Sequence, residues 1–330
     1  MTDAVLEKNN GKKPPLVIIT GPTAVGKSAA SVLLAKRIGA EIISADSMQV
    51  YRGMDIGTAK ITPEEMAGVR HHLIDVLEPE EPFDVVRFQT LAREAIRQII
   101  GRGKIPVLAG GTGFYIQAVL YDIDFSEEET DHSLRRELEE TAARIGKEAF
   151  HDLLKEVDPE SAIAIPAGNV KRVVRALEYY RKNGKPISAH NQEQRQKESV
   201  YNSVYFVLTD EREKIYARID QRVDEMIRNG LPEEVAALRE RGCTKEMISM
   251  QGIGYRQILD WLDGECTLEE ACERVKKETR HFAKRQLTWF RREKDVIWLE
   301  KKDFASPDAL IGHMTDILVQ KGIWAPEQTP

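Results

Sequence analysis

The chain has 330 residues, of which 42% are hydrophobic, and its net charge at pH 7 is −6. This length is enough for a large core and for more than one domain. No apolar run is long enough to cross a bilayer, and residues 1–13 are polar, so we expect no membrane span and no signal peptide but a flexible leader. The acidic balance excludes a generally basic nucleic-acid binder, so RNA contacts would need locally gathered cations.

The three cysteines, at positions 243, 266 and 272, form no C-x-x-C pair. Their spacing fits neither a disulfide framework nor a zinc site, and we expect a reducing, cytoplasmic location. A zinc site at His71 and His72 is also rejected, because neighbouring side chains of a strand point to opposite faces.

The first third of the chain alternates strand-like and helix-like segments. Apolar runs at 16–20, 41–44 and 107–112 predict strands, and the segments 27–38 and 84–100 predict helices. This alternation is typical of an α/β fold with a parallel sheet.

Strand signals disappear between 121 and 200, where helical periodicity, charges and breakers replace them. We predict a helical insertion domain over 121–200, within a core formed by 14–120 and 201–330. The later core segments are expected as a strand at 204–208, helices at 211–228, 232–241, 255–262 and 267–292, and a last strand at 296–299.

A glycine-rich loop joins the first strand to the first helix. Its residues are Gly21, Pro22, Thr23, Ala24, Val25, Gly26, Lys27 and Ser28, a G-x-x-x-x-G-K-[ST] pattern. Backbone amides and the helix N-terminus would hold a di- or triphosphate, Lys27 would contact its outer phosphates, and the Ser28 hydroxyl would bind Mg²⁺ as cofactor. The pattern predicts a P-loop NTPase-like sheet. Because such a loop binds the phosphates and not the group attached to them, the ligand need not be ATP.

A second motif follows the second strand and runs Ala45-Asp46-Ser47-Met48-Gln49-Val50-Tyr51-Arg52-Gly53-Met54-Asp55-Ile56-Gly57-Thr58-Ala59-Lys60. Residues just past the C-terminal ends of parallel strands face the ligand crevice, so Asp46 is expected on the same edge as the phosphate loop. The two motifs together resemble the tRNA dimethylallyltransferases, also called tRNA isopentenyltransferases. The resemblance covers about 16–299, and we expect the bacterial type because no zinc-finger extension follows.

The resemblance implies transfer of a dimethylallyl group from dimethylallyl diphosphate to the N6 amine of the adenosine immediately 3′ of the tRNA anticodon, position 37. The partners would be the tRNA anticodon stem-loop and the prenyl diphosphate, and the enzyme is expected to be a monomer. Asp46 would act as general base, with Lys27 and Thr112 in the catalytic site. The adenine would be flipped out of its stack. The residues expected to hold it are Asp46, Ser47, Met48 and Gln49, with Tyr51 lining the pocket.

Later motifs appear in the family's order, and each also has a purely structural interpretation. Gly110-Gly111-Thr112 is typical of a tight strand-to-helix turn, while the resemblance puts Thr112 on the tRNA. An isolated Arg135 would sit on a solvated helix face, while the resemblance makes it a tRNA contact. Arg218 and Arg222 could pair locally with Asp220 and Asp224, while the resemblance implies that they bind the diphosphate.

Three more segments are implied to contact tRNA. Lys171, Arg172 and Arg175 are close enough on one helix for phosphate contacts, although a solvated face would look the same. The full set implied by the resemblance is Lys171, Arg172, Val173, Val174, Arg175, Gln251, Gly252, Ile253, Gly254, Tyr255, Arg256, Lys284 and Arg285. Trp289 and Phe290, beside the last pair, are more simply explained as core residues, and Asp75 is a possible Walker-B carboxylate.

Three alternatives remain open. A nucleotide or small-molecule kinase would share the phosphate loop and need no RNA. An adenylate isopentenyltransferase would prenylate free AMP, but it needs neither the helical insertion nor the basic segments after Lys171. A non-catalytic RNA-binding module would leave Asp46 and the phosphate loop without a purpose.

Overall fold

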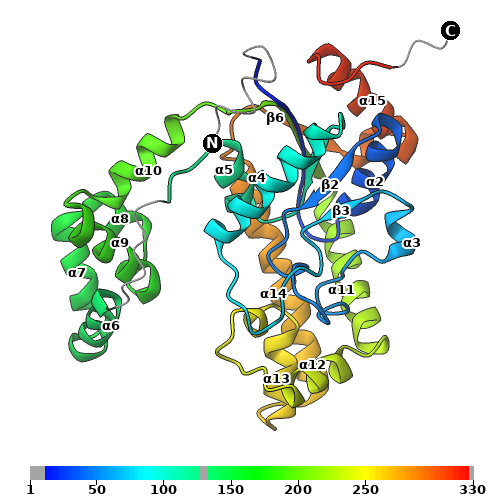
Figure 1. Cartoon of the computed structure of the whole chain (residues 1–330). Coiled ribbons are helices and arrows are strands. Elements are labelled where there is room, and N and C mark those ends of the chain that lie inside the picture. The colour runs from blue at the N-terminus through cyan, green and yellow to red at the C-terminus, as the bar shows by residue number, and fades with distance from the viewer. Residues whose placement is uncertain (1–11, 126–132, 327–330) are drawn as a thin grey trace. The chain divides into compact units, whose positions relative to one another are not determined.

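Figure 1 shows the computed structural model of the chain, which describes residues 12–125 and 133–326. The chain divides into two compact units. The first joins the residues up to Leu120 with those from Val200 onward, and the second is Tyr121–Ser199. Residues 1–11 of the expected leader lie outside the described residues. Among the residues that are described, no helix is long and apolar enough to span a bilayer.

The first unit is built on one six-stranded sheet with the order β3-β2-β4-β1-β5-β6, and every ladder in it is parallel. The strands are β1 (Pro15–Thr20), β2 (Glu41–Ser44), β3 (His71–His72), β4 (Pro106–Ala109), β5 (Asn202–Thr209) and β6 (Val296–Glu300). The predicted α/β class with a parallel sheet is confirmed. Since the strands run the same way, their C-terminal ends share one edge, where ligands bind in such sheets.

Helices cover both faces of this sheet (Figure 1). On one side α2 (Lys27–Ile38) packs against α15 (Pro307–Gln320), and both bury the face that carries Val17 and Phe206. On the other side α4 (Val85–Gly101) packs on β2, β4 and α5 (Gly113–Leu120). Residues of both faces of β1 are fully buried, as expected for the central strand of a doubly covered sheet.

The long helix α14 (Leu268–Phe290) is the main support of the C-terminal part. It packs against α5, α11 (Arg212–Arg228) and α13 (Tyr255–Leu262). The smaller elements of this unit are α3 (Pro63–Met66), α12 (Leu231–Glu240) and the 3-10 turns η1 (Ser249–Gln251) and η2 (Lys301–Asp303).

The described residues of the second unit form helices. These are α6 (Ser133–Ile145), α7 (Lys147–Val157), α8 (Pro159–Ala164), α9 (Val170–Asn183) and α10 (Ile187–Gln196). The unit has its own apolar core, which includes Leu138, Phe150, Leu154 and Leu177. Breakers set its helix ends: Pro159 opens α8, and Gly184 ends α9 with a left-handed φ of 64°.

Candidate active site

The phosphate loop connects β1 to α2 in a backbone conformation that requires glycine. At Gly21, φ is +144°, and a Cβ atom would lie 2.2 Å from the carbonyl oxygen of Leu208. Gly26 caps α2 with φ 93° and without a side-chain hydrogen bond. The amides of the first turn of α2 have no acceptor inside the helix, so they and the helix dipole are suited to the predicted anion, whose binding stays a prediction.

Lys27 is the cation at the centre of this loop. Its Nζ donates to the carbonyl oxygen of Pro22 at 2.8 Å. Burial lowers the pKa of Lys27 to about 8, the carboxylate of Asp46 opposes that shift, and the guanidinium of Arg222 adds to it. Lys27 follows the loop after β1 and Asp46 follows β2, so both lie at the same edge of the parallel sheet.

Asp46 closes a turn directly after β2. Its Oδ1 accepts hydrogen bonds from the amides of Met48 at 2.8 Å and Gln49 at 3.3 Å. Asp side chains favour such turns. The other oxygen, Oδ2, accepts no hydrogen bond from a described residue. One oxygen therefore fixes the orientation of the carboxylate, and the other can receive a proton from a ligand.

Ser28 is exposed in the first turn of α2. Within 12–125 and 133–326, no group of three or more His, Cys, Asp or Glu side chains could hold a metal ion. Mg²⁺ commonly takes one or two oxygens from the protein and completes its shell with phosphate and water. A hydroxyl beside an anion site therefore fits a Mg²⁺ that binds together with a diphosphate, and does not fit an all-protein cage.

The two arginines predicted to bind diphosphate have different surroundings. Arg218 donates to the carbonyl oxygen of Ala24 at 2.9 Å and to Asp210 at 2.8 Å, so it braces the phosphate loop. Arg222, one turn later in α11, has neither a hydrogen bond nor an ion pair with any described residue, and burial lowers its pKa. A cation that is partly buried and unpaired is costly unless a ligand compensates it, so Arg222 is the better candidate for an anion contact.

The two acids that alternate with these arginines do not pair along α11. Asp220 instead binds Arg280, and Asp224 binds Lys276 at 2.7 Å, both on α14. The alternative of local ion pairing within α11 was therefore wrong. The alternating pattern was real, but the carboxylates reach across to the neighbouring helix, where packing of α11 on α14 brings the cations close.

Gln49, expected at the adenine, already has a structural task. Its Nε2 donates to the carbonyl oxygens of Thr58 at 3.4 Å and Ala59 at 3.2 Å. These bonds tie the start of the segment 46–60, the Asp46 loop, to its end. Ser47 and Met48 are half-buried in the same turn as Asp46.

Two further expectations for this region are corrected. Tyr51 does not line a substrate pocket: it is fully buried, with its ring edge-on to Phe83 at 6.4 Å, and burial raises its pKa to about 12. Asp75 is not placed as a Walker-B carboxylate, because it pairs with Lys60, which also binds Asp55.

The turn after β4 brings Thr112 close to the Asp46 turn. A Cβ atom at Gly110 would lie 2.3 Å from the carbonyl oxygen of Ala45, so this crossing tolerates only glycine. The amide of Thr112 donates to that same carbonyl at 3.3 Å. The tight-turn interpretation and the substrate-site interpretation are thus compatible, because the turn itself places Thr112 beside the residue that precedes Asp46.

Gln286 is a site residue that the sequence analysis missed. This buried side chain of α14 accepts a hydrogen bond from the amide of Thr23 at 2.8 Å and donates to the carbonyl oxygen of Gly111 at 2.9 Å. It therefore joins the phosphate loop to the Thr112 turn. Since the Thr23 amide is engaged here, it is not available to a diphosphate. The only signal in the sequence was that Gln286 directly follows Lys284 and Arg285, which were expected at the RNA.

The segment 251–256 is mostly structural where it was expected to contact tRNA. Tyr255 is fully buried, and its hydroxyl donates to Glu234 at 2.6 Å. Gly254 is buried at the N-cap of α13, and Arg256 pairs with Glu278. The direct tRNA contact assigned to Tyr255 is therefore wrong, because the ring fills the space beside a glycine of the Asp46 loop.

The other members of this segment remain candidates for tRNA contact. Gln251 is exposed, and its Nε2 donates to the carbonyl oxygen of Lys245. Gly252 and Ile253 are half-buried, and a Cβ atom at Gly252 would lie 2.6 Å from the Met48 side chain. The turn thus borders the Asp46 loop.

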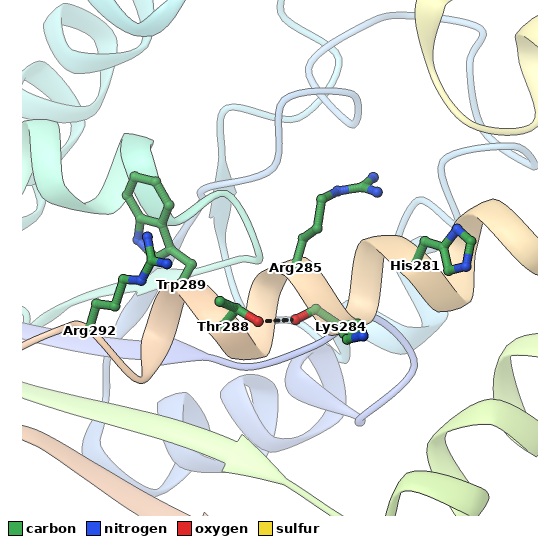
Figure 2. A pocket seen from close by; sticks show the side chains of 6 residues that line it. All are labelled: His281, Lys284, Arg285, Thr288, Trp289 and Arg292. Atoms are coloured by element: carbon green, nitrogen blue, oxygen red, sulfur yellow. Dashed lines mark hydrogen bonds between the residues drawn. The ribbon is translucent and has the colours of Figure 1, made fainter. Parts of the chain in front are cut away.

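A cavity of about 420 Å³ lies along one face of α14, and Figure 2 shows its lining. The lining residues recur at helical spacing: His281, Lys284, Arg285, Thr288, Trp289 and Arg292. The lining residues include three cations and no carboxylate. Lys284 and Arg285, both expected at the RNA, are exposed there. The Thr288 hydroxyl donates to the carbonyl oxygen of Lys284 at 2.9 Å, within the helix itself (Figure 2).

The two aromatic residues at the end of α14 differ. Phe290 is fully buried, as the core interpretation predicts. Trp289 is only half-buried and lines the cavity, with its ring against Gly113 and edge-on to Phe114. Its Nε1–H is buried and donates to no described residue. The core interpretation was therefore wrong for Trp289.

In the second unit, the predicted tRNA residues separate into two sets. Lys171, Arg172 and Arg175 are exposed on α9. Val173 and Val174 belong to the unit's apolar core, so a direct tRNA contact for them is wrong. In an amphipathic helix the residues between exposed cations face inward.

Arg135 binds an oxygen of the buried Glu178 at 2.7 Å and 3.1 Å. This ion pair accounts for Arg135 without RNA, and a second role in tRNA contact stays a prediction.

The adjacent histidines have separate partners. His72 Nε2 lies 2.8 Å from Glu41, and His71 Nδ1 lies 2.9 Å from the carbonyl oxygen of Val69. Each ring thus has its own partner within the protein.

A phosphate loop on a parallel sheet, with a carboxylate turn beside it, defines an α/β protein that acts on phosphorylated ligands. The model of the IPP transferase family matches residues 49–293, and that of the isopentenyl transferases matches residues 14–81. The chain belongs to the IPP transferase family, and the resemblance inferred from its motifs is confirmed.

Bacterial relatives cover nearly the whole chain. A tRNA dimethylallyltransferase of Lachnoclostridium phytofermentans is 58% identical over 309 residues, which are 94% of this chain and 99% of the relative. One from Geobacillus thermodenitrificans is 51% identical over 288 residues, 87% of this chain and 91% of the relative.

Solved structures agree. The tRNA isopentenylpyrophosphate transferase of Bacillus halodurans matches with a TM-score of 0.71 and 46% identity, covering 94% of this chain and 97% of its own. A eukaryotic dimethylallyltransferase acting on tRNA matches with a TM-score of 0.79 and 29% identity, covering 96% and 82%. The predicted P-loop type of fold is thereby confirmed.

Proposed function

We propose that this protein is a tRNA dimethylallyltransferase, which transfers the dimethylallyl group of dimethylallyl diphosphate to the N6 amine of the adenosine 3′ of the anticodon and releases diphosphate. Its relatives carry this activity in their names. The observation that carries the proposal is that the turn after β4 lies beside both the phosphate loop and the Asp46 turn: Gln286 joins Thr23 to Gly111, and the Thr112 amide donates to the carbonyl oxygen of Ala45. A proton acceptor next to a diphosphate site is the arrangement that alkylation of an amine by a prenyl diphosphate needs.

The reaction forms a bond between N6 and C1 of the prenyl group and breaks the bond between C1 and the diphosphate oxygen. The N6 lone pair is delocalised into the adenine ring, so removal of an N6 proton assists the attack. Oδ2 of Asp46 accepts that proton, while Oδ1 stays bound to the amides of its own turn.

The leaving diphosphate gains negative charge as the C1–O bond breaks. Lys27, Arg222 and the first amides of α2 stabilise it, and Arg218 keeps the loop in shape through Ala24. Mg²⁺ held by the Ser28 hydroxyl would supply further charge neutralisation on the diphosphate when it is bound.

Exposed cations provide the RNA contacts. Lys284, Arg285 and Arg292 lie along the α14 cavity, and Lys171 and Arg172 lie on α9 of the second unit. Phosphate contacts of this kind position an RNA without reading its sequence. The adenine is flipped into the site beside Ser47, Met48 and Thr112.

The enzyme works as a monomer in the cytoplasm under this proposal. Cys243, Cys266 and Cys272 are all free, which suits a reducing compartment. The molar mass measured by sedimentation equilibrium tests whether the protein is a monomer.

Labelled dimethylallyl diphosphate separates this proposal from its alternatives. Offered tRNA and AMP in turn, the enzyme should label tRNA and leave AMP unlabelled. Label on AMP would favour an adenylate isopentenyltransferase. Phosphate transfer from ATP to a small acceptor, with no dependence on tRNA, would favour a kinase.

A further inference from the structure

The carboxylate of Glu234, on α12, binds the far end of the Asp46 loop. It accepts hydrogen bonds from three consecutive amides, those of Asp55 at 2.9 Å, Ile56 at 2.7 Å and Gly57 at 3.1 Å. It also accepts one from the hydroxyl of Tyr255 at 2.6 Å. Each oxygen of the carboxylate thus accepts two hydrogen bonds. These charge-assisted bonds join segments about 180 residues apart in sequence.

Tyr255 completes this contact by packing as well as by its hydroxyl. A Cβ atom at Gly57 would lie 2.6 Å from the Tyr255 ring, so the loop approaches the ring as closely as a glycine permits. Burial raises the pKa of Tyr255, and the nearby Glu234 carboxylate adds to that rise, so the hydroxyl stays protonated and donates. The D-I-G and G-Y-R segments of the sequence are therefore two halves of one contact.

Hydrogen bonds lead from this contact to Asp46. The residues after Gly57 present their carbonyls to Gln49, since Thr58 and Ala59 both accept from its Nε2. The backbone amide of Gln49 in turn donates to Oδ1 of Asp46. A contiguous chain of contacts thus joins Glu234 to the carboxylate that would take the proton.

We infer that Glu234, assisted by Tyr255, is a positioning residue for Asp46. It touches neither donor nor RNA in this role; it fixes the loop whose first turn aims the Asp46 carboxylate. The expected effect on kcat rests on the proposed function. The expected effect on hydrogen exchange in the Asp46 loop can be measured without any substrate.

Glu234→Gln is the main test, because it keeps the shape of the side chain and removes the charge that four donors share. Glu233→Gln is the matched control, as Glu233 is an exposed neighbour on the same helix. Hydrogen exchange of the Met48 and Gln49 amides should become faster in Glu234→Gln alone, on the order of tenfold, which is the size expected when one charged hydrogen bond is removed.

Kinetics then separate positioning from general weakening. At saturating tRNA and donor, kcat of Glu234→Gln should fall by about tenfold or more, while KM for dimethylallyl diphosphate stays within about twofold, because the phosphate loop is untouched. Tyr255→Phe should shift both readouts in the same direction and by less, and it serves as the variant if Glu234→Gln does not fold.

Three results would overturn the inference. Exchange and kcat could both match the Glu233→Gln control. Exchange could become faster across the whole chain, which would mean a loss of global stability. Exchange at Met48 and Gln49 could rise with kcat unchanged, which would mean that Asp46 does not depend on the anchor. If the wild-type enzyme labels no tRNA, the proposed function fails, and local exchange still decides whether Glu234 holds the loop.

Discussion

The amides of its own turn hold one oxygen of the Asp46 carboxylate. Replacing Asp46 by Asn keeps a side-chain oxygen for the amides of Met48 and Gln49 and removes the proton acceptor. We expect the rate of prenyl transfer to fall by about 10²–10⁴-fold, the usual contribution of general-base catalysis. Binding of tRNA should change little. Single-turnover rates and tRNA affinities of the wild type and Asp46→Asn test this expectation. A variant rate close to that of the wild type would show that Asp46 is not the general base.

Lys27 should make donor binding depend on pH. Its pKa is lowered to about 8, so the cation is present below pH 8 and is lost as the pH rises through that value. Between pH 7 and pH 9 the affinity of the free enzyme for dimethylallyl diphosphate should therefore fall by about tenfold.

Calorimetric titration at the two pH values checks this expectation. Lys27→Met is the control and should bind weakly at both. Equal affinity of the wild type at pH 7 and pH 9 would show that the Lys27 charge does not hold the diphosphate.

At the scale of elements, α9 of the second unit carries exposed cations that look like phosphate contacts. Lys171→Glu with Arg172→Glu should weaken tRNA binding and flatten its dependence on salt, by roughly 0.7–0.9 in the log–log slope for each phosphate that the variant no longer neutralises. Arg144→Glu with Lys155→Glu changes the same charge elsewhere on this unit and should leave the slope unchanged. If the variant with Lys171→Glu and Arg172→Glu binds tRNA with the same affinity and the same salt dependence as the wild type, this face of α9 is only solvated and does not contact tRNA.

Elements whose signal is local were predictable from the sequence. The strand at 41–44 and the helices at 27–38 and 255–262 have the predicted bounds, because apolar periodicity and flanking glycines determine them. The phosphate loop was predictable for the same reason, since one short pattern dictates its backbone.

Contacts between distant segments were not predictable. Gln286 meets Thr23 across 263 residues, and no periodicity reports such a pair. Tyr255 and Val173 were assigned to tRNA by their motifs, but burial decided otherwise. A motif contains residues that build a site as well as residues that touch a ligand, and the packing of the structure distinguishes the two.

For the whole molecule, a net charge of −6 is reconciled with RNA binding by where the charges lie. Many carboxylates are used within the protein: Glu41 binds Arg102 and His72, and Glu178 binds Arg135. The residues that line the α14 cavity include cations and no carboxylate. A local basic face can therefore attract phosphate although the total charge is negative.

In the proposed reaction, Asp46 and the phosphate loop together promote alkylation of N6 of the adenosine 3′ of the anticodon by dimethylallyl diphosphate. The most direct measurement reacts two anticodon stem-loops with labelled dimethylallyl diphosphate, one with this adenosine and one with guanosine in its place, and maps the product nucleoside by mass spectrometry. We predict a prenyl group on N6 of that adenosine, none on the guanosine variant, and release of one diphosphate for each transfer. Prenylation of the guanosine variant, or of free AMP at an equal rate, would contradict it.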